Sequence, residues 1–187
     1  MTEAHDEATP GRAPGPRVLV SAASMHGSTA EIARAIGQEL GERGLIVTLA
    51  TPGEVRSVDD YDAVIIGSAV YVGHWLDQAI DLIERCRDAL AARQVWLFSS
   101  GPVGDPSGKR AQAMRKDPVE LAGLRAATYA RDHRMFAGKL DRKVLTRPQR
   151  AALLVFRGLE GDFRDWAEIR EWAGSIARQL MPARSRR

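Results

Sequence analysis

The chain has one cysteine and no long apolar run, and both features limit the classes of protein to which it can belong. Cys86 is the only cysteine, so an intrachain disulfide is impossible and a reducing, cytoplasmic setting is expected. Cys86 lies in a helical pattern, which favours a buried structural thiol over a redox nucleophile. No stretch approaches the ~20 consecutive apolar residues of a transmembrane helix. Residues 1–16 are rich in Pro, Gly, Ala and acids, which predicts a disordered extension rather than a signal peptide.

Several well-known site motifs are also missing from the sequence. There is neither a GxxxxGK[ST] loop nor a GxGxxG spacing. No cluster of metal-ligating residues occurs, and no Ser/His/Asp or Cys/His set points to nucleophilic catalysis. The chain matches no nucleic-acid-binding module, so nucleic acid is not an expected partner. These absences leave the catalytic residues unassigned.

What the sequence does contain is a regular alternation of short apolar runs and helical patterns. The expected strands are 18–22, 46–50, 63–67, 95–99 and about 133–137. The expected helices are 28–43, 75–92, 118–130, 148–157 and 165–180. Five strands separated by helices predict an α/β fold with a doubly wound parallel sheet. We expect one domain over 17–181, followed by a basic tail over 182–187.

The last expected helix, 165–180, has a capping residue at its start and an apolar face. Asp165 is placed to cap its N-terminus, and Glu168 follows three residues later as in a capping box. Its apolar residues fall mostly on one face, so Trp166 and Trp172 are expected to belong to the core.

The first expected strand leads into a loop of small hydroxyl residues around a glycine, Ser24-Met25-His26-Gly27-Ser28-Thr29, which we call the 24–29 loop. A helix N-terminus presents unpaired N–H groups and the positive end of the helix dipole, so the loop is a candidate anion cradle. Gly27 permits close backbone approach, and the hydroxyls add donors. The alternative interpretation is a simple capping box between Ser28 and Glu31.

Two further loops follow strands of the same expected sheet. The loop 67–75 is rich in small residues and offers the ring of Tyr71 or Trp75 as a stacking plane. The loop 99–105 is again small, polar and glycine-rich. Each alone is also compatible with a simple turn. Because ligands bind beyond the carboxyl ends of such strands, three loops of this kind at one edge indicate a site for a flat heterocycle carrying a phosphate.

These three loops together resemble the flavodoxin superfamily, and more narrowly its branch containing menaquinone-dependent protoporphyrinogen IX dehydrogenase. The segments 136–141 and 161–166 are similar to that branch as well, and the resemblance runs from about Val18 to Leu180. It implies the strand order 2-1-3-4-5, helices on both faces of the sheet, and FMN as the cofactor. The phosphate loop departs from many flavodoxins in one respect, because His26 stands where they carry a second Thr.

The resemblance also implies which residues contact FMN. The phosphate would be bound in the 24–29 loop, chiefly by Ser24, Gly27, Ser28 and Thr29, beside Met25 and His26. The two edges of the flavin ring would be contacted by Ser68, Ala69, Val70, Tyr71, Val72 and Gly73, and by Ser99, Ser100 and Gly101. His26 and His74 lie in these loops as candidate proton relays, although solvent-facing or capping roles fit them too.

Charge is distributed unevenly along the chain. Residues 1–102 carry 8 Lys/Arg and 14 Asp/Glu, a net charge of −6, whereas residues 103–158 carry 13 and 5, a net charge of +8. The basic segment predicts an anionic partner. Within it, 142–157 combines arginines with an apolar stretch, so it is a candidate peripheral membrane contact or, alternatively, packs on the sheet edge.

These observations favour an FMN-dependent oxidoreductase that passes electrons to a quinone. A basic rim suits an anionic substrate, such as a tetrapyrrole dicarboxylate, better than docking on basic redox partners. The alternatives are a flavodoxin-type electron carrier, an NAD(P)H-dependent quinone or FMN reductase, and a binding module of the same fold without flavin.

Overall fold

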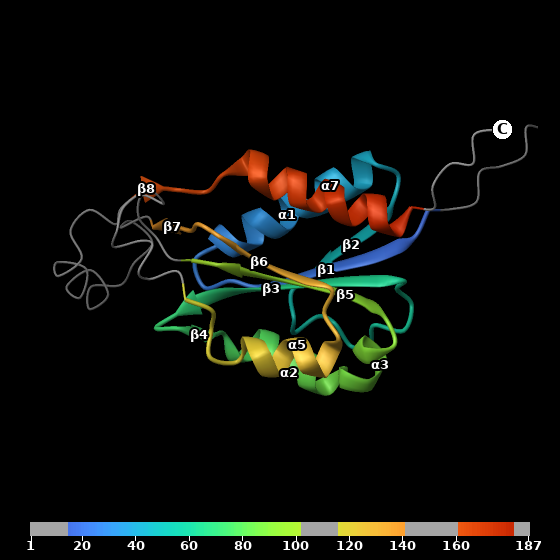
Figure 1. The fold of residues 1–187 in the computed structure, drawn as a ribbon, viewed down its shortest axis with the longest axis horizontal. Coiled ribbons are helices and arrows are strands. Elements are labelled where there is room, and N and C mark those ends of the chain that lie inside the picture. The colour runs from blue at the N-terminus through green and yellow to red at the C-terminus, as the bar shows by residue number, and fades with distance from the viewer. Residues whose placement is uncertain (1–14, 102–115, 141–160, 182–187) are drawn as a thin grey trace, which may run out of the picture.

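A computed structural model describes residues 15–101, 116–140 and 161–181 of the chain. Five parallel strands form its sheet in the order β2-β1-β3-β5-β6 (Figure 1). They are β1 (Arg17–Ala23), β2 (Ile46–Ala50), β3 (Ala63–Tyr71), β5 (Gln94–Ser100) and β6 (Asp132–Phe136). A short strand β4 (His74–Trp75) pairs antiparallel with the end of β3. Counted over the five parallel strands, the order is 2-1-3-4-5, so the expected doubly wound fold is confirmed.

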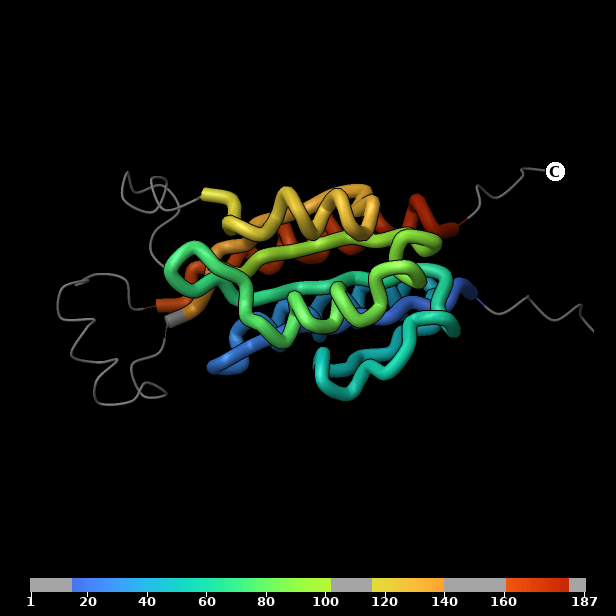
Figure 2. The backbone as a smooth tube through the Cα atoms, turned by 90° about the horizontal axis from the view of Figure 1, so that it is seen from below, coloured from blue at the N-terminus to red at the C-terminus, as the bar shows by residue number. Residues whose placement is uncertain are grey.

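Helices cover both faces of the sheet, as predicted. On one face lie α1 (Ser28–Glu42) and α7 (Trp166–Leu180), and on the other lie α2 (Asp77–Arg85), α3 (Arg87–Ala91) and α5 (Leu121–Thr128) (Figures 1 and 2). The single helix expected over 75–92 is wrong, because the chain leaves helical geometry at Cys86, between α2 and α3. The helix expected over 148–157 lies outside the described residues.

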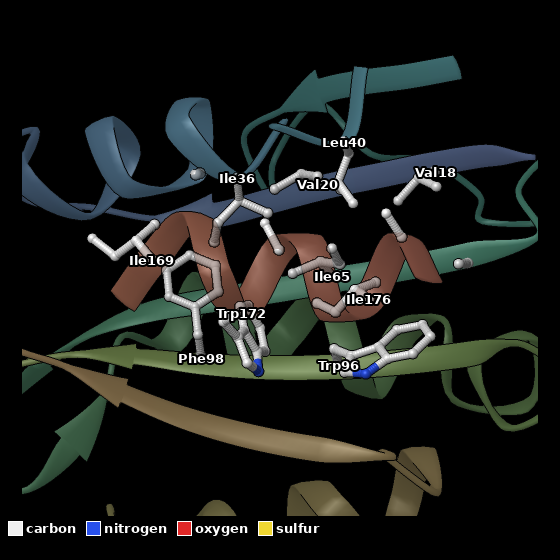
Figure 3. Packing of buried hydrophobic residues seen from close by; sticks show 14 of the residues in the cluster. Val18, Val20, Ile36, Leu40, Ile65, Trp96, Phe98, Ile169, Trp172 and Ile176 are labelled. Atoms are coloured by element: carbon white, nitrogen blue, oxygen red, sulfur yellow. The ribbon is translucent and has the colours of Figure 1, made fainter. Parts of the chain in front are cut away.

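The central strands are buried on both faces, which explains their continuous apolar sequence. Along β5, Trp96 and Phe98 pack toward α1 and α7 (Figure 3), whereas Val95 and Leu97 pack toward α2, α3 and α5. Trp172 of α7 packs edge-on against Phe98, with ring centroids 6.2 Å apart. Since period-2 alternation places successive residues on opposite faces, a helix layer on each face is needed to cover both apolar sets.

Local predictions about the last helix and the cysteine are confirmed. The Asp165 carboxylate caps α7 by accepting hydrogen bonds from the N–H groups of Ala167 and Glu168, at 2.9 and 3.0 Å. Trp172 is 3% exposed and Trp166 is partly buried against the same core. Cys86 is buried, and this burial raises the pKa of its thiol, so it is not an activated nucleophile.

A two-stranded antiparallel ribbon, β7 (Lys139–Leu140) and β8 (Gly161–Asp162), lies at the same end of the molecule as the β3–β4 hairpin (Figures 1 and 2). Within the described ranges no helix is long and apolar enough to cross a bilayer. Residues 1–14 of the extension expected over 1–16, the expected tail over 182–187 and the candidate membrane contact over 142–157 fall outside those ranges.

Candidate functional site

The carboxyl ends of β1, β3 and β5 meet at one edge of the sheet, where the three predicted loops begin. The parallel register pairs Ala23 with Ser68 and Ala69 with Ser100, so the strands end side by side. The prediction that these loops start from one edge of the sheet is therefore confirmed.

The 24–29 loop ends in an open helix N-terminus. Gly27 is the N-cap of α1 and has φ 86°, a left-handed conformation that L side chains rarely adopt. A Cβ built on Gly27 would meet no atom within 4 Å, so the space beside it is unfilled by the described residues. Within the described ranges, no side chain caps α1. The first-turn N–H groups of α1 therefore have no side-chain partner among the described residues and remain available to a ligand at this end of the helix.

The alternative capping-box interpretation of this loop is wrong. Ser28 is the first residue of the helix rather than its cap. The Glu31 carboxylate instead accepts a hydrogen bond from the Arg164 guanidinium at 2.7 Å. The box fails because both of its side chains have partners on a different part of the chain, 111 and 133 residues away.

His26 adds an unsatisfied polar atom to the same loop. Its Nε2 is buried, and no described residue provides it with a hydrogen-bond partner. Its ring meets that of Tyr71 edge-on, with centroids 6.4 Å apart. Buried ring nitrogens are ordinarily hydrogen-bonded. Of the other loop residues, Thr29 is 1% exposed, Ser24 is partly buried and the Met25 side chain is 51% exposed.

The loop predicted over 67–75 is largely a β-hairpin. Strand β3 continues to Tyr71, and the turn consists of Val72 and Gly73, with φ 52° and 85°. Positive φ at both central residues is the signature of type I′ hairpin turns. A β-branched residue is costly in this region, and Val72 is 97% exposed at the tip. Of the two candidate stacking rings, Tyr71 is 39% exposed, whereas Trp75 is buried and unavailable.

The hairpin is held by residues at the start of α5, a contact that the sequence did not predict (Figure 2). Glu120 interacts with His74 Nδ1 at 2.5 Å and accepts a hydrogen bond from the Trp75 N–H at 3.2 Å. The Val119 N–H donates to the Gly73 carbonyl at 3.0 Å. Burial raises the pKa of Glu120, but these hydrogen bonds outweigh it and the net shift is downward. His74 is therefore an anchor of the hairpin.

The serines at the strand ends point into the protein. Ser68 Oγ donates to the Ala69 carbonyl and accepts from the Leu76 N–H. Ser99 Oγ accepts from Trp75 Nε1 at 2.8 Å and contacts His133 Nε2 at 2.9 Å. Ser100 is also buried. The hydroxyls of Ser68 and Ser99 therefore form hydrogen bonds within the protein and hold the strand ends in place.

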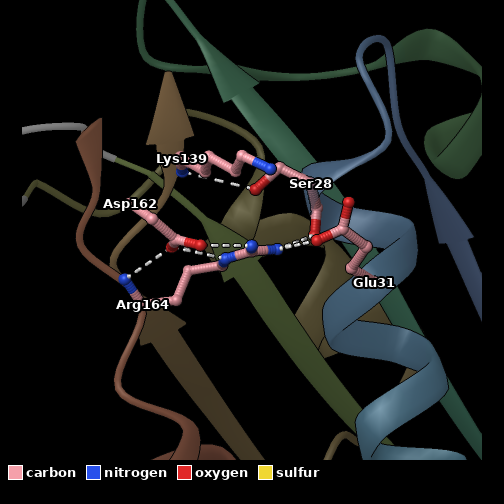
Figure 4. Close-up of polar contacts among 5 residues, drawn as sticks. All are labelled: Ser28, Glu31, Lys139, Asp162 and Arg164. Carbon is pink, nitrogen blue, oxygen red and sulfur yellow. Dashed lines mark hydrogen bonds and ion pairs between the residues drawn. The ribbon is translucent and has the colours of Figure 1, made fainter. Parts of the chain in front are cut away.

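A polar cluster that the sequence did not predict lies beside the first turn of α1. Arg164, whose side chain is 2% exposed, binds Asp162 and Glu31, and the Lys139 N–H donates to Ser28 Oγ (Figure 4). Burial lowers the pKa of Arg164, but the hydrogen bonds that its guanidinium donates to the carboxylates of Asp162 and Glu31 outweigh this, and the net shift is upward. In the sequence, the only indication of this cluster is that Arg164 follows Asp162 by two residues.

The fold and this edge together define an α/β protein with a candidate phosphate cradle beside an exposed aromatic ring. Residues 19–165 match the sequence profile of the flavodoxin domain family. The chain belongs to this family. No curated protein sequence matches the chain.

Solved structures with the same fold include flavodoxins and a larger oxidoreductase. A flavodoxin from the domain Archaea is 17% identical, with TM-score 0.56, and the alignment covers 88% of this chain and 98% of that one. For a flavodoxin from Streptococcus pneumoniae TIGR4, identity is 20%, TM-score 0.56, and coverage 88% and 99%. Rubredoxin:oxygen oxidoreductase from Desulfovibrio gigas is 18% identical, with TM-score 0.56; the alignment covers 89% of this chain but 37% of that one.

The residues of the cradle fit the FMN phosphate that the resemblance implies. In the part of the chain that the structure describes, the open space at Gly27, the uncapped N-terminus of α1 and the unpartnered Nε2 of His26 all belong to one loop. Backbone N–H groups of this kind bind phosphate without a P-loop lysine. His26, which departs from the Thr of many flavodoxins, is itself able to donate a hydrogen bond to an anion.

Proposed function

We propose that this chain is an FMN-dependent oxidoreductase that delivers electrons to a quinone. FMN binding is supported chiefly by the N-terminus of α1 beside Gly27, which no described side chain caps and where a Cβ would meet no described atom within 4 Å. When bound, FMN supplies the redox chemistry itself, so the protein needs no dedicated acid–base pair.

The residues of the chain then bind and orient the cofactor. The N–H groups of the first turn of α1, with Ser28 and Thr29, bind the phosphate, and His26 Nε2 satisfies its missing hydrogen bond there. Tyr71 offers its partly exposed ring to one side of the flavin. The backbone at Ser99–Gly101 borders the opposite edge, where buried side chains keep the strand end fixed.

An apolar rim favours a quinone as the acceptor. Met25 is 51% exposed, Val72 97% and Val119 72%, and these side chains belong to the 24–29 loop, the hairpin tip and the segment bonded to it. Flavodoxin-type carriers that dock on basic partners need acidic side chains around the cofactor, and apolar ones do not serve that purpose. An apolar acceptor gains free energy by covering such surface.

The donor is proposed to be an anionic tetrapyrrole of the protoporphyrinogen type, because of the sequence resemblance and the excess of basic residues over 103–158. Each pair of hydrogens lost by the donor, as two electrons and two protons, reduces one quinone to its hydroquinone. The test is oxidation of protoporphyrinogen IX by FMN-loaded protein with a menaquinone analogue. A rate above that without enzyme supports the proposal. Rapid exchange with a reductase but no turnover of the organic donor would favour the carrier function instead.

Peripheral membrane contact through 142–157 is part of the same proposal, because a lipid-borne quinone is reached at the membrane surface. Neutralising Arg147, Arg150 and Arg157 together is expected to weaken binding to vesicles containing anionic lipid, by about 1 kcal/mol per charge. Sedimentation with vesicles measures this. Absence of vesicle binding by the parent protein would contradict the membrane contact while leaving the flavin site untouched.

A further inference from the structure

Arg164 is a buried cation beside the N-terminus of α1, where its charge is of the unfavourable sign. Its side chain is 2% exposed, and one guanidinium nitrogen, Nη1, donates to the Ser28 carbonyl at 3.3 Å and to Glu31 at 2.7 Å. The positive end of a helix dipole repels a cation, and burial of a guanidinium adds a desolvation cost. The chain nevertheless places Arg164 there, which calls for a compensating arrangement.

Two carboxylates and an aromatic ring provide that compensation. Arg164 Nε and Nη2 donate to the two oxygens of Asp162 at 2.7 and 2.6 Å, a bidentate pair, and the guanidinium lies 4.4 Å from the centroid of Trp166. Glu31 supplies the second negative charge. The two carboxylates more than offset the guanidinium charge, and the result is a direct connection between the segment 161–166 and the first turn of α1 (Figure 4).

The connection continues through the β7–β8 ribbon back to Ser28. Asp162 is the direct cross-strand partner of Lys139, and the Lys139 N–H donates to Ser28 Oγ at 3.3 Å. Arg164 therefore fixes the Ser28 carbonyl directly, and Asp162 fixes its hydroxyl through the ribbon. Ser28 is held from both sides by segments more than 100 residues away in sequence.

This double attachment determines how the Ser28 hydroxyl is used. A hydroxyl has one donor and two acceptor positions, so a Ser28 oxygen that accepts from Lys139 keeps its own O–H available. Acceptance of a hydrogen bond also polarises that O–H and strengthens it as a donor. At the first position of α1 the available partner is an anion bound by the helix N-terminus.

We infer that Arg164 is a positioning residue that, with Asp162 and the β7–β8 ribbon, orients Ser28 as a donor to the flavin phosphate and so makes the protein select FMN over riboflavin. This inference rests on the proposed FMN function. Arg164 acts through Ser28, so its loss is expected to affect the phosphate-bearing ligand far more than the ligand without phosphate.

The test compares dissociation constants for FMN and riboflavin, measured by quenching of flavin fluorescence. Arg164→Met is expected to weaken FMN binding about tenfold or more, the worth of one hydrogen bond to a charged group, and to change riboflavin binding less than about twofold. Arg164→Lys is expected to retain little of the parent's FMN affinity, because an ammonium group cannot form the bidentate pair of a guanidinium. The control is Arg43→Met. It removes an ion pair at the other end of α1, where the Arg43 guanidinium lies 2.7 Å from the Glu39 carboxylate. It should leave the FMN-to-riboflavin ratio unchanged.

A double-mutant cycle with Ser28→Ala gives the decisive comparison. If Arg164 acts through Ser28, Ser28→Ala alone lowers the ratio to a similar extent, and adding Arg164→Met lowers it little further. Additive losses, or an unchanged ratio in Arg164→Met, would overturn the inference. Should Arg164→Met not fold, Asp162→Asn and Ser28→Ala provide the same readout. A parent protein that binds neither flavin would overturn the proposed function itself, which is a different result from an unchanged ratio.

Discussion

Substitution of Gly27 is expected to weaken cofactor binding strongly while lowering the stability of the fold only a little. Its φ of 86° is unfavourable for an L side chain, but a Cβ there meets no described atom within 4 Å. Gly27→Ala should therefore cost only backbone strain, about 1–2 kcal/mol, with no steric clash. For a chain of this size that corresponds to a fall in Tm of roughly 2–8 °C. The fold should persist.

FMN binding should respond much more strongly than stability. The space beside Gly27 is where the phosphate must approach the N–H groups of α1, so a side chain there displaces one or two charge-assisted hydrogen bonds. At about 1.5–3 kcal/mol each, this weakens FMN binding by roughly 10- to 10⁴-fold, and Gly27→Leu should abolish it. Titration of flavin fluorescence gives the affinity, and thermal unfolding gives the stability.

Gly41 provides a matched control on the same helix. It also has open space at its Cβ position, but its φ lies outside the positive region. Gly41→Ala should stabilise the helix by up to about 1 kcal/mol and leave FMN affinity unchanged. Normal FMN affinity in Gly27→Leu would refute the assignment of the cradle.

Three further predictions concern the scaffold around the site. Gly67→Ala places a Cβ 2.1 Å from the ring of Phe98, so the free energy of unfolding should fall by about 1–3 kcal/mol or more in urea titrations; an unchanged midpoint would contradict the packing. Burial lowers the pKa of His133 from its ordinary value of 6.5, so the unfolded state takes up the proton first, and stability should fall as the pH drops below about 6.5. In His133→Gln the dependence of Tm on pH between 7.5 and 5.5, compared with the parent, should be shallower, and equal slopes would exclude this role. Glu120→Gln removes the charge that interacts with His74, so amide hydrogen exchange at residues 73–75 should accelerate, whereas unchanged exchange would show that the hairpin holds without it.

The sequence predicts the layout of this protein well because that layout depends on local patterns. The continuous apolar runs at 63–67 and 95–99 identify strands covered on both faces, and all five parallel strands were placed within a few residues. The hydroxyl-rich 24–29 loop identifies the start of α1 in the same way. These features follow from periodicity and from the geometry of a strand that leads into a helix.

Contacts between distant segments were not predictable in the same way. Glu120 and His74 are 46 residues apart, and Arg164 and Glu31 are 133 apart, with no shared periodicity that would link them. The predicted stacking role of Trp75 fails because the hairpin turns its ring inward onto Ser99. Ser28 and Glu31 have the spacing of a capping box, yet tertiary partners take both side chains. Local spacing identifies a candidate interaction, and the packing of remote segments decides whether it forms.

Binding of FMN by the 24–29 loop is tested by the visible absorption spectrum of the purified protein. The spectrum is recorded before and after addition of FMN and removal of the excess. The flavin bands are expected to correspond to about one FMN per chain, and Gly27→Leu is expected to lose them. A folded parent protein that stays colourless after exposure to FMN would contradict FMN binding.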